Sequence, residues 1–320
     1  MISSITIPSA SLAMSDNVKR EITDLIEAEK DRLGSYARVA TKAKTSTATI
    51  SQMTAGNWEL IAEKMWAQVA SALNWTPVGW QMAPTTNVRI VQNLLDTAKR
   101  ESLFMAISHK AGSGKTASLK DFETKYRGHQ VYYISCREWA RREFLANLAQ
   151  NLGIDSAGRA MSVDGMLMGV TEFFRQRRNA RPLLILDEAD KLKAAALRTL
   201  ITLYNECEDG LGLIIAGTDH LAQSMNRDAR YNRKGSEELL SRFGRKFQTL
   251  VGATASDVEA ICTANGVQDK AVARAIFQEG QPVKRMWGNR SVEVVEDMRH
   301  IKRLVQREIL KSMKMEAPAE

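Results

Sequence analysis

Cysteine and histidine are scarce in this chain of 320 residues, which contains three cysteines and four histidines. Cys136, Cys207 and Cys262 are odd in number and far apart, a pattern that predicts neither a disulfide framework nor a zinc site. We expect each of them to be a small buried hydrophobe in a protein of a reducing cytoplasm. The histidines are scattered and form no metal-ligand pattern.

Long apolar runs are missing as well, because none approaches the roughly 18 residues that a membrane-spanning helix requires. Residues 1–8 lack a basic region followed by a long apolar core, so we expect no signal peptide. Internal repeats and low-complexity tracts are also absent. What remains is the composition of a globular protein, with 44% hydrophobic and 26% charged residues and enough length for two or three domains.

Positive charge is in excess and is unevenly placed along the chain. The formal net charge is +8, whereas residues 1–76 contain eight basic and eight acidic side chains. The whole excess therefore lies downstream of residue 76. A basic balance of this kind favours a polyanion such as nucleic acid as a partner.

A loop of small residues follows the apolar segment Leu103–Ser108 and ends in Gly-Lys-Thr. Between a strand and a helix, such a loop predicts a cradle for nucleotide phosphates, since glycines let backbone N–H groups converge on phosphate oxygens. Lys115 is expected to reach the β- and γ-phosphates and Thr116 to hold Mg²⁺. The complete pattern has a further glycine where this chain has His109. The predicted cofactor-binding residues of the loop are Lys110, Ala111, Gly112, Ser113, Gly114, Lys115 and Thr116.

A continuous apolar run, Leu183–Leu186, ends in Asp187 and Glu188 and predicts a strand buried on both faces of a parallel sheet. Open α/β sheets bind ligands at the carboxyl ends of their strands, so Asp187 is expected to hold Mg²⁺ and Glu188 to polarise the attacking water. Alternatively, the two acids cap the helix that follows. The upstream Gly-Lys-Thr loop favours the nucleotide interpretation. The run also spells the signature of DEAD-box helicases, but no Ser-Ala-Thr motif or second motor domain follows it.

Strand and helix patterns alternate from residue 103 onward. Apolar strand patterns occur at residues 103–108, 130–135, 183–186 and 211–217, and helical patterns lie between them. This alternation predicts an α/β fold in which a parallel sheet carries helices on both faces. Thr218 directly follows the last of these strands. A polar residue there either orients the attacking water and senses the γ-phosphate, or simply caps the strand end.

The N-terminal segment is helical in pattern, and residues 39–56 resemble the helix-turn-helix of the phage-repressor (Cro/CI-type) family. In that motif Ala40 lies where the two helices touch and Ile50 is buried in the second helix. The family usually has glycine in the turn where this chain has Lys44, which then needs a strained backbone or a longer turn. The resemblance implies weak or non-specific DNA contact, with a three-helix bundle for protein contacts as the alternative. The candidate DNA-binding residues are Arg38, Lys42, Lys44, Thr47, Thr49, Ser51 and Gln52.

Arginines are concentrated between residues 226 and 246, around a predicted short helix at residues 237–245 that leads to an edge strand. Such arginines neutralise transition-state charge on a neighbouring subunit's nucleotide, bind DNA phosphates, or form solvated helix faces, and spacing alone does not rank these possibilities. The remainder of the chain, to about residue 312, is helical in pattern. Gly288–Ser291 is expected to open the last helix, which places Arg290 in its first turn.

The order of these motifs along the chain resembles that of the AAA+ ATPases. It runs from the phosphate loop to the Asp-Glu strand, the polar strand end, the arginine-bearing helix and the helical lid. The N-terminal helix-turn-helix and the run Ile215–His220 extend the resemblance to the transposition protein B family of phage Mu. The resemblance implies ATP and Mg²⁺ as cofactors, Thr218 at the sensor 1 position and Arg290 as the sensor 2 arginine. It also implies that Arg242 or Arg245 is an arginine finger acting in trans, without deciding between the two.

The same resemblance implies an ATPase in the cytoplasm of a bacterial host cell, assembled as a homo-oligomeric ring or filament on double-stranded DNA with little sequence preference. The filament captures target DNA, and a cognate transposase is recruited and stimulates hydrolysis. The expected domains are a helix-turn-helix domain at 1–75, a linker at 76–86, an AAA+ core at 87–251, a helical lid at 252–312 and a flexible tail at 313–320. Two other classes stay open, a transcription regulator with a regulatory ATPase and a helicase-loader-type AAA+ protein.

Overall fold

The computed structural model describes residues 16–73, 80–126, 129–154 and 161–315. The chain forms two compact units, one made of residues 1–83, 259–276 and 305–320 and the other of residues 84–258 and 277–304. In the described ranges no helix is both long and apolar enough to cross a membrane. Residues 76–79 of the expected linker and residues 316–320 of the expected C-terminal tail lie outside the described residues.

The N-terminal segment folds as a small bundle of helices with its own apolar core. Its elements are α1 (Asp16–Leu33), α2 (Tyr36–Lys42), α3 (Thr47–Thr54), the 3₁₀ turn η1 (Trp58–Leu60) and α4 (Glu63–Ala72). The side chains of Val18, Ile22 and Ile26 recur at helical spacing on α1 and pack with Ile50 of α3 and Trp66 of α4. The apolar stripe that the sequence shows on α1 is therefore the side of the helix that the bundle buries.

The turn between α2 and α3 has the conformation that the sequence predicts. The backbone N–H of Thr49 donates to the hydroxyl of Ser46 at 3.0 Å, which caps the start of α3. Lys44, where glycine is usual, has a φ of 51°, in the left-handed region that disfavours a side chain. Ala40 and Ile50 are buried, as expected. Contact of these helices with DNA stays a prediction.

The second unit is built on a five-stranded parallel sheet of order β2-β3-β4-β1-β5. The strands β3 and β4 are buried along their whole length, because each has neighbours on both edges and helices on both faces. The strands are β1 (Phe104–Ser108), β2 (Val131–Ser135), β3 (Leu183–Asp187), β4 (Gly212–Gly217) and β5 (Phe247–Gln248).

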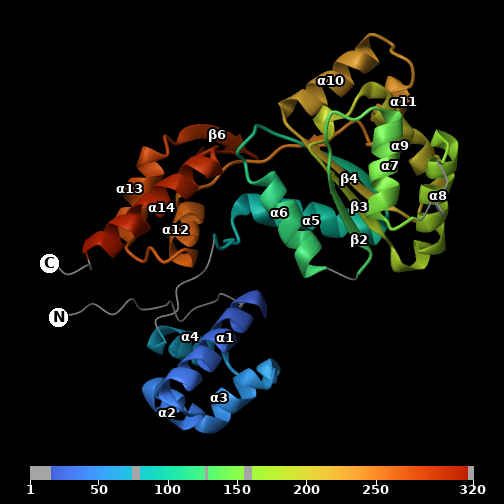
Figure 1. Ribbon diagram of the computed structural model, residues 1–320. Helices are drawn as coiled ribbons and strands as arrows, with labels where there is room; N and C mark the ends of the chain where they lie inside the picture. The colour runs from blue at the N-terminus through green and yellow to red at the C-terminus, as the bar shows by residue number, and fades with distance from the viewer. Residues whose placement is uncertain (1–15, 74–79, 127–128, 155–160, 316–320) are drawn as a thin grey trace. The chain divides into compact units, whose positions relative to one another are not determined.

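Helices cover both faces of this sheet (Figure 1), so the predicted α/β fold is confirmed. Successive side chains of a strand point to opposite faces. Accordingly, Leu184 and Leu186 of β3 pack with α7, α8 and α9, whereas Leu183 and Ile185 pack with α5 and α6. The helices of this unit up to β5 are α5 (Thr86–Glu101), α6 (Lys115–Lys125), α7 (Arg141–Asn151), α8 (Val163–Gln176), α9 (Ala194–Cys207), α10 (Asp219–Arg230) and α11 (Ser236–Arg242), with 3₁₀ turns η2 (Arg178–Ala180) and η3 (Ala189–Lys191).

The C-terminal part differs from the all-helical expectation. After α12 (Ala255–Ala264) and α13 (Lys270–Glu279) comes an antiparallel hairpin of β6 (Val283–Trp287) and β7 (Arg290–Val294), and only then α14 (Met298–Met315). Arg290 is therefore an exposed residue of a strand, and the prediction of a helix that opens at Gly288–Ser291 is wrong. The last helix begins after Asp297, whose carboxylate accepts the backbone N–H of Arg299 at 2.8 Å.

Candidate nucleotide-binding site

The predicted phosphate loop connects β1 to α6 at the carboxyl edge of the parallel sheet. Gly112 and Gly114 have φ values of 84° and 88°, which side chains rarely adopt, so both glycines are required by the backbone. His109 has no such conformation, and its N–H extends the sheet by donating to the carbonyl of Gly217 at 3.3 Å. Residue 109 thus continues the strand, which explains why the loop accommodates a side chain at this position of the pattern.

Lys115 is buried at the first position of α6, and its ammonium group lies over the loop that precedes it. It donates to the carbonyl oxygens of His109 (2.6 Å) and Lys110 (2.9 Å) and to the hydroxyl of Ser113 (3.2 Å). Burial lowers the pKa of Lys115, while the carboxylates of Asp187 and its acidic neighbours act in the opposite direction. The lysine is thus a desolvated cation enclosed by phosphate-loop oxygens, as a residue that binds phosphate should be.

Asp187 ends β3 and is almost completely buried, with 1% of its surface exposed. Its Oδ1 accepts the N–H of Glu188 at 2.9 Å and its Oδ2 accepts the hydroxyl of Tyr133 at 2.9 Å. Burial and the Asp187 charge raise the pKa of Tyr133, so this hydroxyl remains a donor at neutral pH. Because the carboxylate is held by these donors and not by the amides of a helix, the alternative of Asp187 as a helix cap has no support.

Glu188 has a left-handed backbone, with φ of 56°, at the point where the chain leaves β3. Its carboxylate is partly exposed, accepts a hydrogen bond from the Ser135 hydroxyl (3.2 Å) and pairs with Lys191 (2.9 Å). Backbone conformations of this kind cost free energy and cluster at functional sites, because they direct a side chain that regular structure would misplace. Here the conformation places the Glu188 carboxylate at the carboxyl end of β3, directly after Asp187, and its role in polarising water stays a prediction.

Thr116 occupies the first turn of α6 and is exposed, so its hydroxyl is accessible to a cation bound with the nucleotide. Among the described residues, no group of three or more His, Cys, Asp and Glu side chains is placed to hold a metal ion. The residues at this edge of the sheet nonetheless fit a Mg²⁺-bound nucleotide. They comprise two left-handed glycines and a buried lysine for the phosphates, and an accessible hydroxyl and a buried carboxylate for the metal ion.

Thr218, at the end of β4, is fixed by an acid that sequence reasoning did not assign. Its hydroxyl donates to Oδ2 of Asp190 at 2.5 Å, and its carbonyl accepts the hydroxyl of Ser108 at 2.8 Å. A Cβ at Gly217 would lie 2.8 Å from Asp190 Oδ1, so the glycine makes room for this carboxylate. The Thr218 side chain makes no capping bond to α10, and the choice between a nucleotide-sensing residue and a strand-end cap stays open.

We expect Asp190 to act as a positioning residue for Thr218. Replacing Asp190 by alanine should lower the kcat for ATP hydrolysis about 10-fold and leave the KM for ATP nearly unchanged, since the carboxylate holds Thr218 and not the nucleotide. Thr218→Val should have a similar effect, and the double variant should lose no more than either single one. Additive losses in steady-state kinetics, or a KM effect alone, would contradict this coupling.

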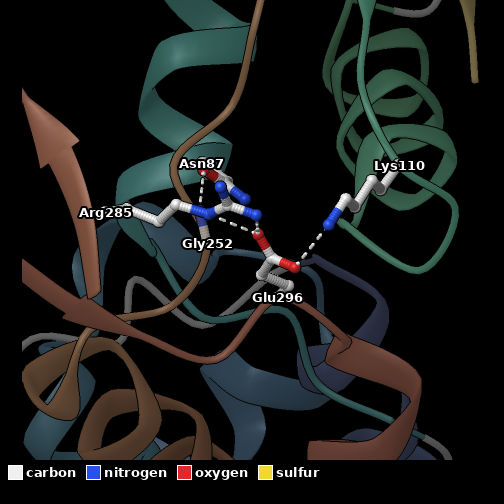
Figure 2. A network of polar contacts seen from close by, with 5 residues as sticks. All are labelled: Asn87, Lys110, Gly252, Arg285 and Glu296. Carbon is white, nitrogen blue, oxygen red and sulfur yellow. Dashed lines mark hydrogen bonds and ion pairs between the residues drawn. The ribbon is translucent and has the colours of Figure 1, made fainter. Parts of the chain in front are cut away.

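The start of α14 and the β6–β7 hairpin are joined to the phosphate loop by polar contacts (Figure 2). The Glu296 carboxylate accepts a hydrogen bond from Lys110 at 3.0 Å on one oxygen and from Arg285 Nε at 2.6 Å on the other. Burial works to raise the pKa of Glu296, but these two cations outweigh it and hold the pKa below its usual value. The N–H of Met298 also donates to the carbonyl of Gly112 at 2.8 Å.

Asn87 makes a second connection to the same loop from the start of α5. Its amide nitrogen donates to the carbonyl of Ser113 (3.2 Å), and its Oδ1 accepts the N–H groups of Val251 (3.0 Å) and Gly252 (3.3 Å). Asn87 is 4% exposed, and all of these bonds form away from bulk water. The phosphate loop is thus supported by side chains that come from both sides of it in the sequence.

Arg299 takes the place in the first turn of the last helix that the sequence analysis gave to Arg290. Its charge acts on Lys115, whose pKa is lowered first by burial and also by this guanidinium. Arg290 makes no side-chain hydrogen bond or ion pair within the described part of the chain. The sensor 2 role therefore loses its basis at Arg290, and Arg299 becomes the candidate.

The two candidate finger arginines differ in how they are held. Arg242 donates to Asn205 Oδ1 (2.9 Å), pairs with Glu238 (3.2 Å) and lies 4.9 Å from the ring centre of Tyr204. Arg245 is more exposed and pairs only with Glu237, at 2.5 Å, among the described residues. The structure shows Arg242 in a fixed position and Arg245 more accessible, and the choice between them stays open.

The candidate DNA-binding residues of the N-terminal bundle are partly engaged in contacts of their own. Arg38 donates to the carbonyl of Leu33 (2.8 Å), and Lys42 pairs with Glu29 at 2.6 Å. Lys44, Thr47 and Ser51 are exposed, while Thr49 and Gln52 are half-buried. Their common role in binding DNA is not tested by these positions and stays a prediction.

Sequence reasoning missed several residues that shape this site, namely Tyr133, Asp190, Asn87, Glu296 and Arg299. A tyrosine in a strand next to the Asp-Glu strand and an acid three residues after Asp187 are weak signals. The start of the last helix gave a clearer one, since an Asp directly before a helical run is a common N-cap. None of these signals shows the contact itself, because each partner is distant in the sequence.

The sheet and its loops define a P-loop AAA+ fold. A sheet of this strand order has a phosphate loop after β1, an acid pair at the end of β3 and a polar residue after β4. Comparison with known proteins agrees, since residues 98–225 match the AAA domain family model. The crystal structure of Cdc6p from Pyrobaculum aerophilum, 17% identical, superimposes with a TM-score of 0.51 over 75% of this chain and 65% of that one. At this identity the likeness supports the fold alone.

Among curated proteins, the chain is similar to the Mu-like prophage FluMu DNA transposition protein B of Haemophilus influenzae. The two are 24% identical over 194 residues, which is 61% of this chain and 64% of that protein. The matched region thus spans less than two thirds of the relative's length. The predicted resemblance to the AAA+ ATPases and to Mu transposition protein B is confirmed, and the AAA-domain match supports an ATPase.

Proposed function

We propose that this chain hydrolyses ATP and, in its ATP-bound form, assembles on double-stranded DNA to deliver that DNA as a target to a transposase. The observation that carries the proposal is the arrangement of Lys115, Asp187 and Glu188 at one edge of the sheet, in a chain similar to a DNA transposition protein B. The transposase would in turn stimulate hydrolysis. A bacterial cytoplasm as the location follows from the same similarity.

Each residue of the site has a defined task in this reaction. Lys115 would exchange its loop oxygens for those of the β- and γ-phosphates, and Thr116 and Asp187 would hold Mg²⁺. Mg²⁺ neutralises charge that develops on the phosphate oxygens. Glu188 would orient and polarise the attacking water, and Arg299 would neutralise γ-phosphate charge from the same subunit.

In this proposal a second copy of the chain completes the nucleotide site, and ATP hydrolysis therefore depends on assembly. An arginine supplied in trans stabilises transition-state charge and raises hydrolysis rates by orders of magnitude. Arg242 and Arg245 are the candidates, and both lie at the end of α11 or just beyond it. Hydrolysis would then report that neighbouring subunits have assembled.

DNA is the proposed partner on which the chain assembles, because the whole net positive charge of the chain lies downstream of residue 76. The α2–α3 segment would add a weak contact through the residues named above, without reading a defined sequence. Contacts dominated by phosphates bind DNA of any sequence and weaken as salt is raised. This is the behaviour that delivery of arbitrary target DNA requires.

Footprinting on random-sequence DNA with ATP and Mg²⁺, together with electron microscopy of the same samples, tests this function. We expect uniform protection and regular assemblies with ATP and neither without nucleotide. A short protected operator would instead identify a transcription regulator with a regulatory ATPase. Copurification with a replicative helicase in place of a transposase would identify a helicase loader.

A further inference from the structure

The β6–β7 hairpin carries an unusual concentration of exposed apolar side chains. Met286 is 70% exposed, Trp287 48% and Val283 41%, all on the first strand of this two-stranded sheet. The hairpin forms a sheet of its own and pairs with no third strand among the described residues. Val283 and Trp287 share one face of β6 and Met286 lies on the other, so the hairpin exposes apolar side chains on both faces, as a ribbon that contacts another molecule does.

Cations accompany these apolar side chains. Residues 283–294 contain Lys284, Arg285 and Arg290 against the single acid Glu293. Lys284 and Arg290 make no side-chain hydrogen bond or ion pair within the described parts of the chain, and both are exposed. Unpaired cations beside an accessible indole suit a polyanion whose grooves also expose apolar groups, and double-stranded DNA combines phosphates with thymine methyl groups in this way.

The shape of the hairpin fits the same partner. Trp287 pairs with Arg290 in the register, and the connecting turn has Gly288 at a φ of 59°, which makes the tip narrow. The major groove of B-DNA admits a two-stranded β-ribbon of this kind. In that position Trp287 and Arg290 at the tip would enter the groove and Lys284 would lie near the phosphates.

We propose that the β6–β7 hairpin is a DNA-binding ribbon that inserts its tip, Trp287–Arg290, into a groove of double-stranded DNA. The proposal rests on the proposed function and names the element of the ATPase unit that contacts its DNA. The hairpin is also connected to the nucleotide site, because Arg285 of β6 contacts Glu296, which contacts Lys110 of the phosphate loop (Figure 2). DNA on the ribbon would thereby be sensed at the loop that holds ATP.

The test measures the affinity of the full-length chain with ATP and Mg²⁺ for a fluorescein-labelled random-sequence duplex, by fluorescence anisotropy over a range of salt concentrations. Trp287→Ala should weaken binding by roughly fivefold or more, because the apolar contact of the indole with base edges and thymine methyl groups in the groove is lost. Arg290→Ala should weaken binding similarly and lower the slope of log K against log salt by about one. Lys125→Ala removes an exposed cation that pairs with Asp121 and should leave affinity and slope unchanged.

The outcomes separate this proposal from the function on which it rests. If the wild-type chain binds the duplex and Trp287→Ala and Arg290→Ala bind it with the same affinity, the DNA-binding role of the hairpin is overturned and the proposed function stands. Failure of the wild-type chain to bind the duplex overturns both. Variants that keep DNA affinity but lose ATP-dependent assembly, measured by light scattering, would show that the hairpin binds another subunit and would likewise overturn the proposal. Thermal melting of each variant shows that folding is retained.

Discussion

Replacing Lys115 by alanine is expected to abolish ATP hydrolysis and ATP-dependent assembly on DNA. The lysine is buried, and its ammonium lies within 3.2 Å of three oxygens of the phosphate loop, where it is placed to bind the phosphates directly. Loss of a buried charge that holds the γ-phosphate removes substrate binding and transition-state stabilisation together. We expect a fall in kcat/KM of at least about 100-fold, measured by phosphate release.

Lys125→Ala provides the matched control for this variant. Lys125 lies on the same helix, α6, but is exposed and pairs with Asp121 at 2.7 Å. Its loss should change neither nucleotide binding nor hydrolysis, since exposed ion pairs contribute little. Should Lys115→Ala still assemble on DNA when ATP is added, assembly would not be coupled to the phosphate loop, and the proposed function would be wrong.

Glu188→Gln is expected to separate ATP binding from ATP hydrolysis. The amide has the shape of the carboxylate but cannot polarise water, so hydrolysis should fall by roughly 10²–10⁴-fold while ATP remains bound. The ATP-bound chain should then stay on DNA for longer than the wild type, the opposite of the effect of Lys115→Ala. Single-turnover hydrolysis and the lifetime of DNA-bound assemblies after removal of free ATP measure the two effects.

A second variant distinguishes this role from a structural one. Glu188 has a left-handed backbone, so Glu188→Gly should relieve local strain while it removes the carboxylate. If the carboxylate is what hydrolysis needs, the glycine variant will be as inactive as the glutamine variant despite equal or greater thermal stability. Recovery of hydrolysis in either variant would mean that another group polarises the water.

The sheet and the central residues of the site were predictable because they depend on local patterns. Apolar runs of strand length, each bounded by a loop of characteristic composition, identify β1, β3 and β4, and parallel strands place their carboxyl ends on one edge. Lys115, Asp187 and Thr218 follow from that placement alone. The strained turn at Lys44 was predictable for the same reason, since glycine is usual there.

The C-terminal hairpin was missed because two periods compete in the same segment. Val292, Val295 and Met298 have the spacing of a helix, whereas Val292 and Val294 have the spacing of a strand. Pairing with β6 and the bridge between Ala253 and Val295 decide between the two periods, and the bridge involves residues distant in the sequence. The error displaced the start of the last helix and with it the candidate for the sensor 2 arginine.

The contact between Gly112 and Asp297 has a consequence for how relatives of this chain vary. Residue 112 faces the acid that begins α14, and a methyl group at residue 112 would lie 2.5 Å from the Asp297 carboxylate. Either position alone is therefore intolerant of enlargement. A shorter cap such as serine at residue 297 would free this space but would leave the φ of 84° at residue 112, so we expect related sequences to keep glycine at residue 112 whichever cap begins the helix at the other end of the ATPase unit's sequence.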